Sequence, residues 1–381
     1  TGFFCVVPLS VGWAAEWTVL PSIGATGMYN DNLLLTTQPH DATYGFWVSP
    51  AAEFTGKTER LSVSSQTKVS FVSYYGGDEF NFTNYFLPLA VQYKTEKDVL
   101  GFTGGYVRDN TLLGELLETG LVTRFTQRNQ WTANPTWTRQ LTEKLSFKSG
   151  FQFNDTSYEN VSSTNLRDYQ LYGGSGGLLY QVTEKDQLQL SGTYINFHTI
   201  NSPQPLRSSV PGVNLSLTHA FTESLTGTIY GGPSFVSTTV QTGGGNITAH
   251  NTVWLFGANL TKRFEQTTIL VEAARNIVPS GFGLLVQTDR AGLTVSHNLT
   301  EALTASFNGS AYKTQTISSS SAASAAFPEQ RYLSATPAIA WKFAEWWKVE
   351  LSYSHRYREV DGVSGTATSN STMFTLSYNY W

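Results

Sequence analysis

Cysteine is almost missing from this chain of 381 residues, which has one, at position 5. A single cysteine excludes an internal disulfide framework. Charged residues are scarce as well: they make up 14% of the chain, whereas soluble globular proteins have roughly 25%. The composition is therefore not that of an ordinary soluble domain.

Two further absences narrow the class of protein. No basic excess exists, because 24 Lys and Arg stand against 28 Asp and Glu, and the net charge of −4 disfavours a nucleic-acid partner. No apolar run of about 18 residues occurs, which excludes a bundle of membrane-spanning helices. What the chain does have is 33 glycines and 14% aromatic residues. This profile is typical of a large β-protein.

The first fifteen residues differ from the rest. They are uncharged, apolar and then small, as at the end of a secretory signal peptide, with cleavage expected after Ala14 or Ala15. Two alternatives are a lipid anchor on Cys5 and an apolar terminal strand. We expect residues 16–381 to form one domain.

A short charged turn recurs along the chain. It contains Glu, often after Thr, and its copies lie about 40 residues apart, a spacing that suits a hairpin plus its return connection. The eight copies are centred on Glu59, Glu96, Glu143, Glu184, Glu223, Glu265, Glu301 and Glu345.

The segments after these turns alternate with period 2. Apolar Leu145 and Phe147, for example, alternate with polar Ser146 and Lys148, and the same holds after Asp186 and after Trp347. Strict alternation predicts strands with one apolar and one polar face. Because the strands run to about ten residues or more with aromatics toward their ends, the apolar face is expected to meet lipid rather than a sandwich core.

Nine longer connections rich in Gly, Ser, Thr and Asn interleave with the eight turns. Together they imply an all-β fold, a transmembrane antiparallel β-barrel of 18 strands, with 16 as the alternative. Short turns on one side and long loops on the other are typical of the bacterial outer membrane, with the turns on the periplasmic side. Strand prolines at one repeat position are expected to mark a local bulge or a register device rather than loops. They are Pro50, Pro88, Pro135 and Pro337.

Charges on the polar faces identify the expected lumen, because a charge facing lipid costs about 2–4 kcal/mol at the midplane. Arg356 and Arg358 have the alternative of snorkelling at the rim. Because both signs occur, weak ion selectivity is expected. The lumen-lining candidates are Gln66, Lys68, Lys148, Gln152, Glu272, Lys342, Glu350, Arg356 and Arg358.

The connection over 110–127 contains LLGELLETGL, which predicts a short amphipathic helix. Such a helix needs an apolar surface to cover. It either folds inward as a constriction or packs on the outer rim or a neighbouring subunit. The constriction candidates are Leu112, Leu113, Glu115, Leu116, Leu117 and Glu118.

Two stretches carry a family resemblance. The segment from Glu16 through Tyr29-Asn30-Asp31-Asn32-Leu33, followed by Val48-Ser49-Pro50, resembles the start of the beta-barrel porin 2 group and of the exosortase (PEP-CTERM)-associated outer-membrane proteins. The turn Arg139 to Ser146 is similar to theirs too. The resemblance implies an outer-membrane barrel and, for the exosortase-linked relatives, a neighbourhood of exopolysaccharide production.

The C-terminal segment resembles the signal that outer-membrane barrels present to their assembly machinery. It alternates and ends in an aromatic residue, although Trp381 is one residue out of step with the apolar set. The signal residues are Phe374, Leu376, Tyr378, Tyr380 and Trp381.

Chemistry-bearing motifs are weak. The six histidines are scattered, so neither a metal site nor a cofactor is expected. The Asn30-Asp31-Asn32 run is either a cation site or, as we favour, an Asx-rich turn. The glycines at 243–245 are expected at a flexible loop tip within a connection over 241–250. No GxSxG stands out, and no enzymatic activity is expected.

Three functions fit a barrel of this kind. The first is a porin-like pore for diffusion of small hydrophilic solutes, since an 18-strand closure is wide enough for a channel. The second is a conduit for exopolysaccharide export, with Tyr74, Tyr75 and Tyr106 as residues that stack on sugars. The third is a closed structural or adhesive barrel. The expected partners are outer-membrane lipid, the assembly machinery, and small solutes or polysaccharide.

Overall fold

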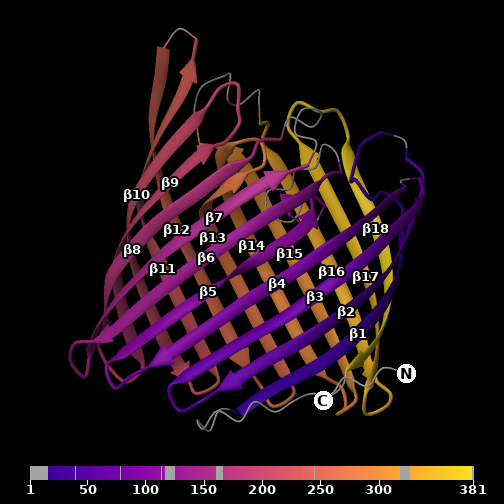
Figure 1. Ribbon diagram of the computed structural model, residues 1–381, viewed down its shortest axis with the longest axis horizontal. Coiled ribbons are helices and arrows are strands. Elements are labelled where there is room, and N and C mark those ends of the chain that lie inside the picture. Colours follow the sequence, from indigo (N-terminus) through magenta and orange to yellow (C-terminus); the bar gives the residue numbers. More distant parts are fainter. Residues whose placement is uncertain are drawn as a thin grey trace.

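The computed structural model describes residues 16–379 except 39, 78, 113, 116–124, 160–165, 244 and 318–326. They form one antiparallel sheet of 18 strands, closed into a barrel by the pairing of the first strand with the last (Figure 1). The predicted strand number is therefore confirmed, and the alternative of 16 is not. The expected signal peptide, 1–15, lies outside the described residues.

The strands follow one another around the barrel in chain order. They are β1 (Glu16–Asn30), β2 (Thr43–Lys57), β3 (Leu61–Gly76), β4 (Phe80–Lys94), β5 (Asp98–Asn110), β6 (Gln127–Gln140), β7 (Leu145–Tyr158), β8 (Tyr169–Gln181), β9 (Asp186–Thr199), β10 (Leu206–Thr222), β11 (Leu225–Thr242), β12 (Gly245–Arg263), β13 (Thr267–Ser280), β14 (Leu284–Asn298), β15 (Leu303–Thr316), β16 (Gln330–Lys342), β17 (Trp347–Val360) and β18 (Thr366–Asn379).

All eight Glu turns lie at one end of the barrel, which we call the turn end, and the nine other connections lie at the loop end. The recurring threonine has a local cause. In five turns its hydroxyl oxygen accepts a hydrogen bond of 2.9–3.0 Å from the backbone N–H three residues later, which closes the turn. These threonines are Thr58, Thr95, Thr142, Thr183 and Thr300.

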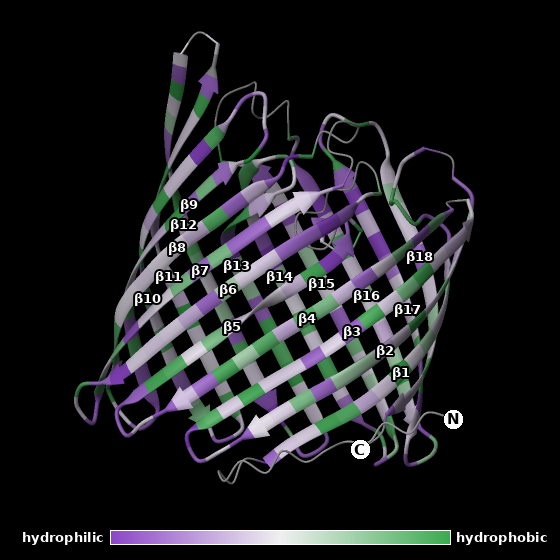
Figure 2. Ribbon diagram, in the orientation of Figure 1, coloured by the Kyte–Doolittle hydropathy of each residue, from purple (hydrophilic) through white to green (hydrophobic). Residues whose placement is uncertain are grey.

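The outer face of the sheet is apolar. Side chains with large exposed apolar surfaces alternate along each strand, from Trp17 (66% exposed) near the turn end to Trp254 (62%) nearer the loop end. Figure 2 shows the resulting apolar positions between more polar ends. Aromatic residues gather near both margins, for example Phe54 and Tyr44 on β2, as in the girdles of membrane barrels.

The strand prolines interrupt the ladder without shifting it. At Pro50, Pro135 and Pro337 the pairing with the following strand opens, and at Pro88 the pairing with the preceding strand β3 opens, yet the register is the same on both sides of each gap. The expected bulges are therefore wrong: the missing N–H removes a hydrogen bond but inserts no residue. At Pro88 the carbonyl is satisfied by the Ser65 hydroxyl, which donates to it over 2.5 Å.

The extent predicted for the connection over 241–250 is also wrong. β11 continues to Thr242 and β12 starts at Gly245, and the two pair along their whole length into the tall hairpin of Figure 1. No helix in the described residues is long and apolar enough to cross a membrane.

Candidate functional site: the barrel interior

Strand register defines the inner face of the barrel. Along each strand, the residues that alternate with the exposed outer-face residues point to the inner face. They pair with inner-face residues of the neighbouring strand, as Lys68 does with Phe86. All nine lumen candidates lie on this face: Gln66 and Lys68 on β3, Lys148 and Gln152 on β7, Glu272 on β13, Lys342 on β16, and Glu350, Arg356 and Arg358 on β17. That they line a water-filled path stays a prediction.

Exposure along the inner face falls from the turn end to the loop end. Lys148 and Lys342, near the turns, are exposed. Inner-face polar residues near the loops, such as Asn30 and Thr156, are buried. The interior is therefore open toward the turn end and filled toward the loop end.

The two carboxylates among the lumen candidates have basic partners on the same face. Glu272 lies 3.3 Å from Arg290, and Glu350 lies 2.9 Å from Lys348. Lys68 instead lies over the Phe86 ring, 5.0 Å from its centroid.

The connection after β5 enters the barrel. Gly114 and Glu115 donate backbone hydrogen bonds to residues 110 and 111, which is the start of a helical turn. The Glu115 side chain is 2% exposed; its carboxylate accepts a hydrogen bond from the Tyr158 hydroxyl and another, of 3.0 Å, from the Gly281 amide. We call Glu115, Tyr158 and Gly281 the inner latch, because it joins β7 to the β13–β14 hairpin.

Other constriction candidates are only partly covered by the structure. Leu112 is buried. Leu113, Leu116, Leu117 and Glu118 lie outside the described residues, and so does the helix expected there.

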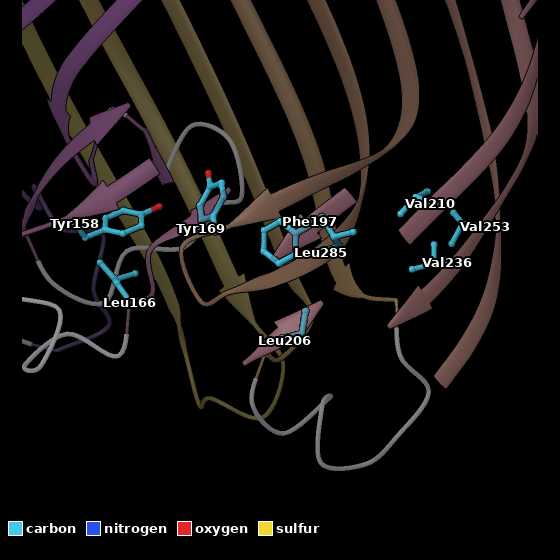
Figure 3. Packing of buried hydrophobic residues seen from close by; sticks show 9 residues of the cluster. All are labelled: Tyr158, Leu166, Tyr169, Phe197, Leu206, Val210, Val236, Val253 and Leu285. Atoms are coloured by element: carbon cyan, nitrogen blue, oxygen red, sulfur yellow. The ribbon is translucent and has the colours of Figure 1, made fainter. Parts of the chain in front are cut away.

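The β13–β14 hairpin folds into the interior. Pairing of β12 with β13 stops at Phe256 and Arg275, whereas β13 stays paired with β14 up to Ser280. The freed tip packs Leu285 into a cluster with inner-face residues of β9 to β12, and Leu285 lies beside Phe197 in Figure 3. The tip thus fills the loop end against the inner face of β9 to β12. Sequence alternation gave no sign of it.

The first connection also folds inward. Leu33 and Leu35 pack with Leu112, with Tyr312 and Tyr332 of β15 and β16, and with Ala367 of β18. Near the end of the connection before β16, Phe327 packs against Val286 at the hairpin tip. The connection after β7 contributes buried Leu166 to the cluster that contains Leu285. Among the described residues, four connections and one hairpin therefore occupy the loop end of the interior.

The Asn30-Asp31-Asn32 run holds the first connection in place. Asn30 Oδ1 accepts a hydrogen bond from the Asn32 amide, an Asx turn, and the Asp31 carboxylate accepts two from Asn370 of β18. Asn32 Nδ2 donates to the carbonyls of Thr36 and residue 368. These contacts support the Asx-turn interpretation, since the side chains are engaged by the protein itself.

A buried ion pair was missed by the sequence analysis. Arg128 on β6 donates two hydrogen bonds of 2.9 Å to Asp109 on β5, and both side chains are at most 5% exposed. Gly114 packs on this pair, since a Cβ there would lie 2.1 Å from Arg128 Cζ. The signal available in the sequence was only two charges near strand ends.

Two of the tyrosines expected to stack on sugars are misplaced. Tyr75 stacks on outward Tyr44, and Tyr106 packs on outward Trp131, so both lie on the outer face. Tyr74 lies on the inner face and packs near Leu33. The error came from treating neighbours in sequence as one set, although adjacent strand residues face opposite sides.

The strand histidines lie on the outer face: His198, His219, His250, His297 and His355. Within the described part of the chain, no group of three His, Cys, Asp or Glu side chains is arranged to hold a metal ion.

The assembly-signal candidates lie on β18. Phe374, Leu376 and Tyr378 follow the outer face, with Tyr378 packed against Trp347, 5.1 Å between ring centroids. Tyr380 and Trp381 lie outside the described residues.

No protein-family model matches the sequence, and no curated protein matches it. Among solved structures, the ferric citrate transporter FecA in its unliganded form is similar with a TM-score of 0.50 and 11% identity, over 89% of this chain and 60% of that one. OccK5 (OpdH) of Pseudomonas aeruginosa has a TM-score of 0.46 and 12% identity, over 95% of this chain and 98% of that one. A BenF-like porin from Pseudomonas fluorescens has 0.45 and 8%, over the same shares.

The likeness to FecA extends to the fold alone. Together with the closed sheet and the apolar outer face, it identifies the chain as a transmembrane β-barrel of the bacterial outer-membrane type.

Proposed function

We propose that the chain is a porin-like pore of the bacterial outer membrane that lets small hydrophilic solutes diffuse through its interior. The observation that carries the proposal is the contrast between the two faces of the closed 18-strand sheet. Its outer face is apolar, and its inner face is polar and charged. A barrel of this strand number is wide enough for an aqueous channel. The inward connections at the loop end restrict passage to small solutes.

Conductance tests this proposal. Purified protein in a planar lipid bilayer is expected to give stepwise currents, and vesicles containing it should swell in a small neutral sugar. Heat-denatured protein is the control. Absence of both currents and swelling would overturn the pore and favour a closed structural barrel.

The pore is better supported than a polysaccharide conduit, because Tyr75 and Tyr106 face outward and the loop end is filled by side chains. We retain as proposals the membership of the porin 2 or exosortase-associated group, the cleavage of residues 1–15, and recognition of the β18 segment by the assembly machinery. We also propose that the protein has no catalytic activity, in keeping with strand histidines that face away from the interior.

A further inference from the structure

Two arginines on the inner face of β17 have no partner. Arg356 and Arg358 lie two residues apart, opposite Ser334 and Tyr332 of β16. Within the described residues neither guanidinium forms an ion pair or a hydrogen bond, and the Nε atom of each is buried and unsatisfied. These are interior positive charges that the fold itself does not neutralise.

Two other inner-face strand arginines are paired with carboxylates: Arg128 is held by Asp109, and Arg290 lies beside Glu272. Arg263, the last residue of β12 at the turn end, forms no ion pair in the described residues. At the loop end of the interior, Arg356 and Arg358 therefore differ from Arg128 in lacking a carboxylate partner.

Neighbouring polar groups on the same wall are also unsatisfied. Gln330 is 2% exposed, yet both its amide nitrogen and its amide oxygen lack partners, and so does the hydroxyl of buried Tyr332. Buried polar groups of proteins are nearly always hydrogen-bonded, so a cluster without partners indicates a missing ligand or water.

The cluster faces the barrel interior. Arg356 interacts electrostatically with Tyr74, which lies on β3, four strands away around the closed sheet. Tyr74 and Tyr332 both belong to the apolar cluster formed by the first connection. The two arginines therefore lie beside the side chains that fill this part of the loop end.

We propose that Arg356 and Arg358, together with Gln330 and Tyr332, bind the anionic group of a solute that uses the pore. The inference rests on the proposed function and adds the substrate class, solutes with a carboxylate or phosphate group. A guanidinium presents N–H donors in a fork that matches either group, and Gln and Tyr add further donors. Arginine is a common lining of anion-selective pores.

The pairing of charges also changes the expected selectivity. Away from the strand ends, the strand carboxylates Glu272 and Glu350 are neutralised by their partners. Lys68 and Lys148 join the two arginines as cations without an ion pair in the described residues. Glu53 is the unpaired inner-face carboxylate of this region. A net positive interior replaces the near balance expected from sequence, so the pore should prefer anions.

Reversal potentials in a KCl gradient test the selectivity. The unmodified protein should pass chloride more readily than potassium, and the double variant Arg356→Gln/Arg358→Gln should bring the permeability ratio close to one. Arg331→Gln is the matched control, because Arg331 lies on the outer face of the adjacent strand, 60% exposed. Currents without anion preference, or equal loss in the control, would overturn the site and leave the pore intact.

Binding provides a readout that does not need conduction. Succinate and inorganic phosphate, titrated calorimetrically into the detergent-purified protein, should bind to it and not to the double variant, whereas glycerol should bind to neither. Binding without any conductance would overturn the pore and support the site. Equal binding by both proteins, or binding by neither, would overturn the site. If the double variant loses binding of only one of the two anions, that anion is the ligand of the site.

Discussion

Two walls of the interior differ in whether their arginine side chains are paired with a carboxylate. On β5 and β6, Arg128 is buried with two hydrogen bonds to Asp109 and has Gly114 packed upon it. On β17, beside β16, Arg356 and Arg358 form no ion pair with any carboxylate of the described residues. The first wall uses its arginine to hold the connection after β5 in the interior. In the second wall, the proposed partner of the two arginines is an anionic solute. An interior arginine therefore has a structural role only where a carboxylate of the protein pairs with it.

Breaking the paired wall should have the largest effect. Asp109→Asn leaves Arg128 buried without a counter-charge, and we expect it to lower the free energy of unfolding by about 3–5 kcal/mol. Urea unfolding followed by tryptophan fluorescence measures the loss. Glu272→Gln is the matched control, because that carboxylate and its partner Arg290 are 42% and 53% exposed, and removing such a pair costs about 0–1 kcal/mol. Equal losses would mean that burial does not distinguish the two pairs.

Crowding the same wall should cost less. Gly114→Ala places a Cβ against the guanidinium of Arg128, which cannot move while Asp109 holds it, and overpacking of this kind costs about 1–3 kcal/mol. Gly243→Ala is the control, since nothing lies within 4 Å of its Cβ. In an Asp109→Asn background the Gly114→Ala penalty should shrink, because the guanidinium is then free to shift. A penalty unchanged in that background would show that the ion pair does not fix Arg128.

Converting the unpaired wall into a paired one sharpens the comparison. Ser334→Glu puts a carboxylate opposite Arg356, and we expect stability to change by no more than about 1 kcal/mol, because the new pair is only half-buried. The chloride preference measured by reversal potential should fall. Ser310→Glu, one strand away on the inner face, is the control for an added interior charge. An unaltered preference in Ser334→Glu would separate Arg356 from the selectivity.

The smallest effect concerns an exposed ion-pair group at the loop end. Lys313, and then Arg331, lower the pKa of Glu329 below its usual range. A lowered carboxylate pKa stabilises the folded state above the unfolded-state pKa near 4.5, and this contribution disappears as pH falls through the folded-state value. Glu329→Gln should therefore remove a slight part of the acid-induced fall in the thermal midpoint at low salt. The same acid profile in both proteins would contradict it.

Strand number and inner or outer face follow from local sequence, because a period of 2 needs only neighbouring residues such as Phe147 and Lys148. The filled interior does not. Glu115 meets the Gly281 amide across 166 residues of chain, and Leu285 at the hairpin tip packs with Phe197 of β9, although β9 and β14 are not neighbours in the sheet. Ion pairing is hidden from the sequence for the same reason: composition counts Glu272 and Glu350 as separate charges, whereas the fold places them beside Arg290 and Lys348.

Thiol labelling of adjacent positions tests the central claim, a water-filled interior behind an outer face in lipid. Lys148→Cys and Phe147→Cys, each in a Cys5→Ala background and reconstituted into vesicles, are treated with a membrane-impermeant maleimide. Lys148 is exposed on the inner face, whereas Phe147 lies on the outer face against Trp137. We predict rapid modification at position 148 and protection at position 147 until detergent is added. Modification at 147 with protection at 148 would contradict the assignment of the two faces.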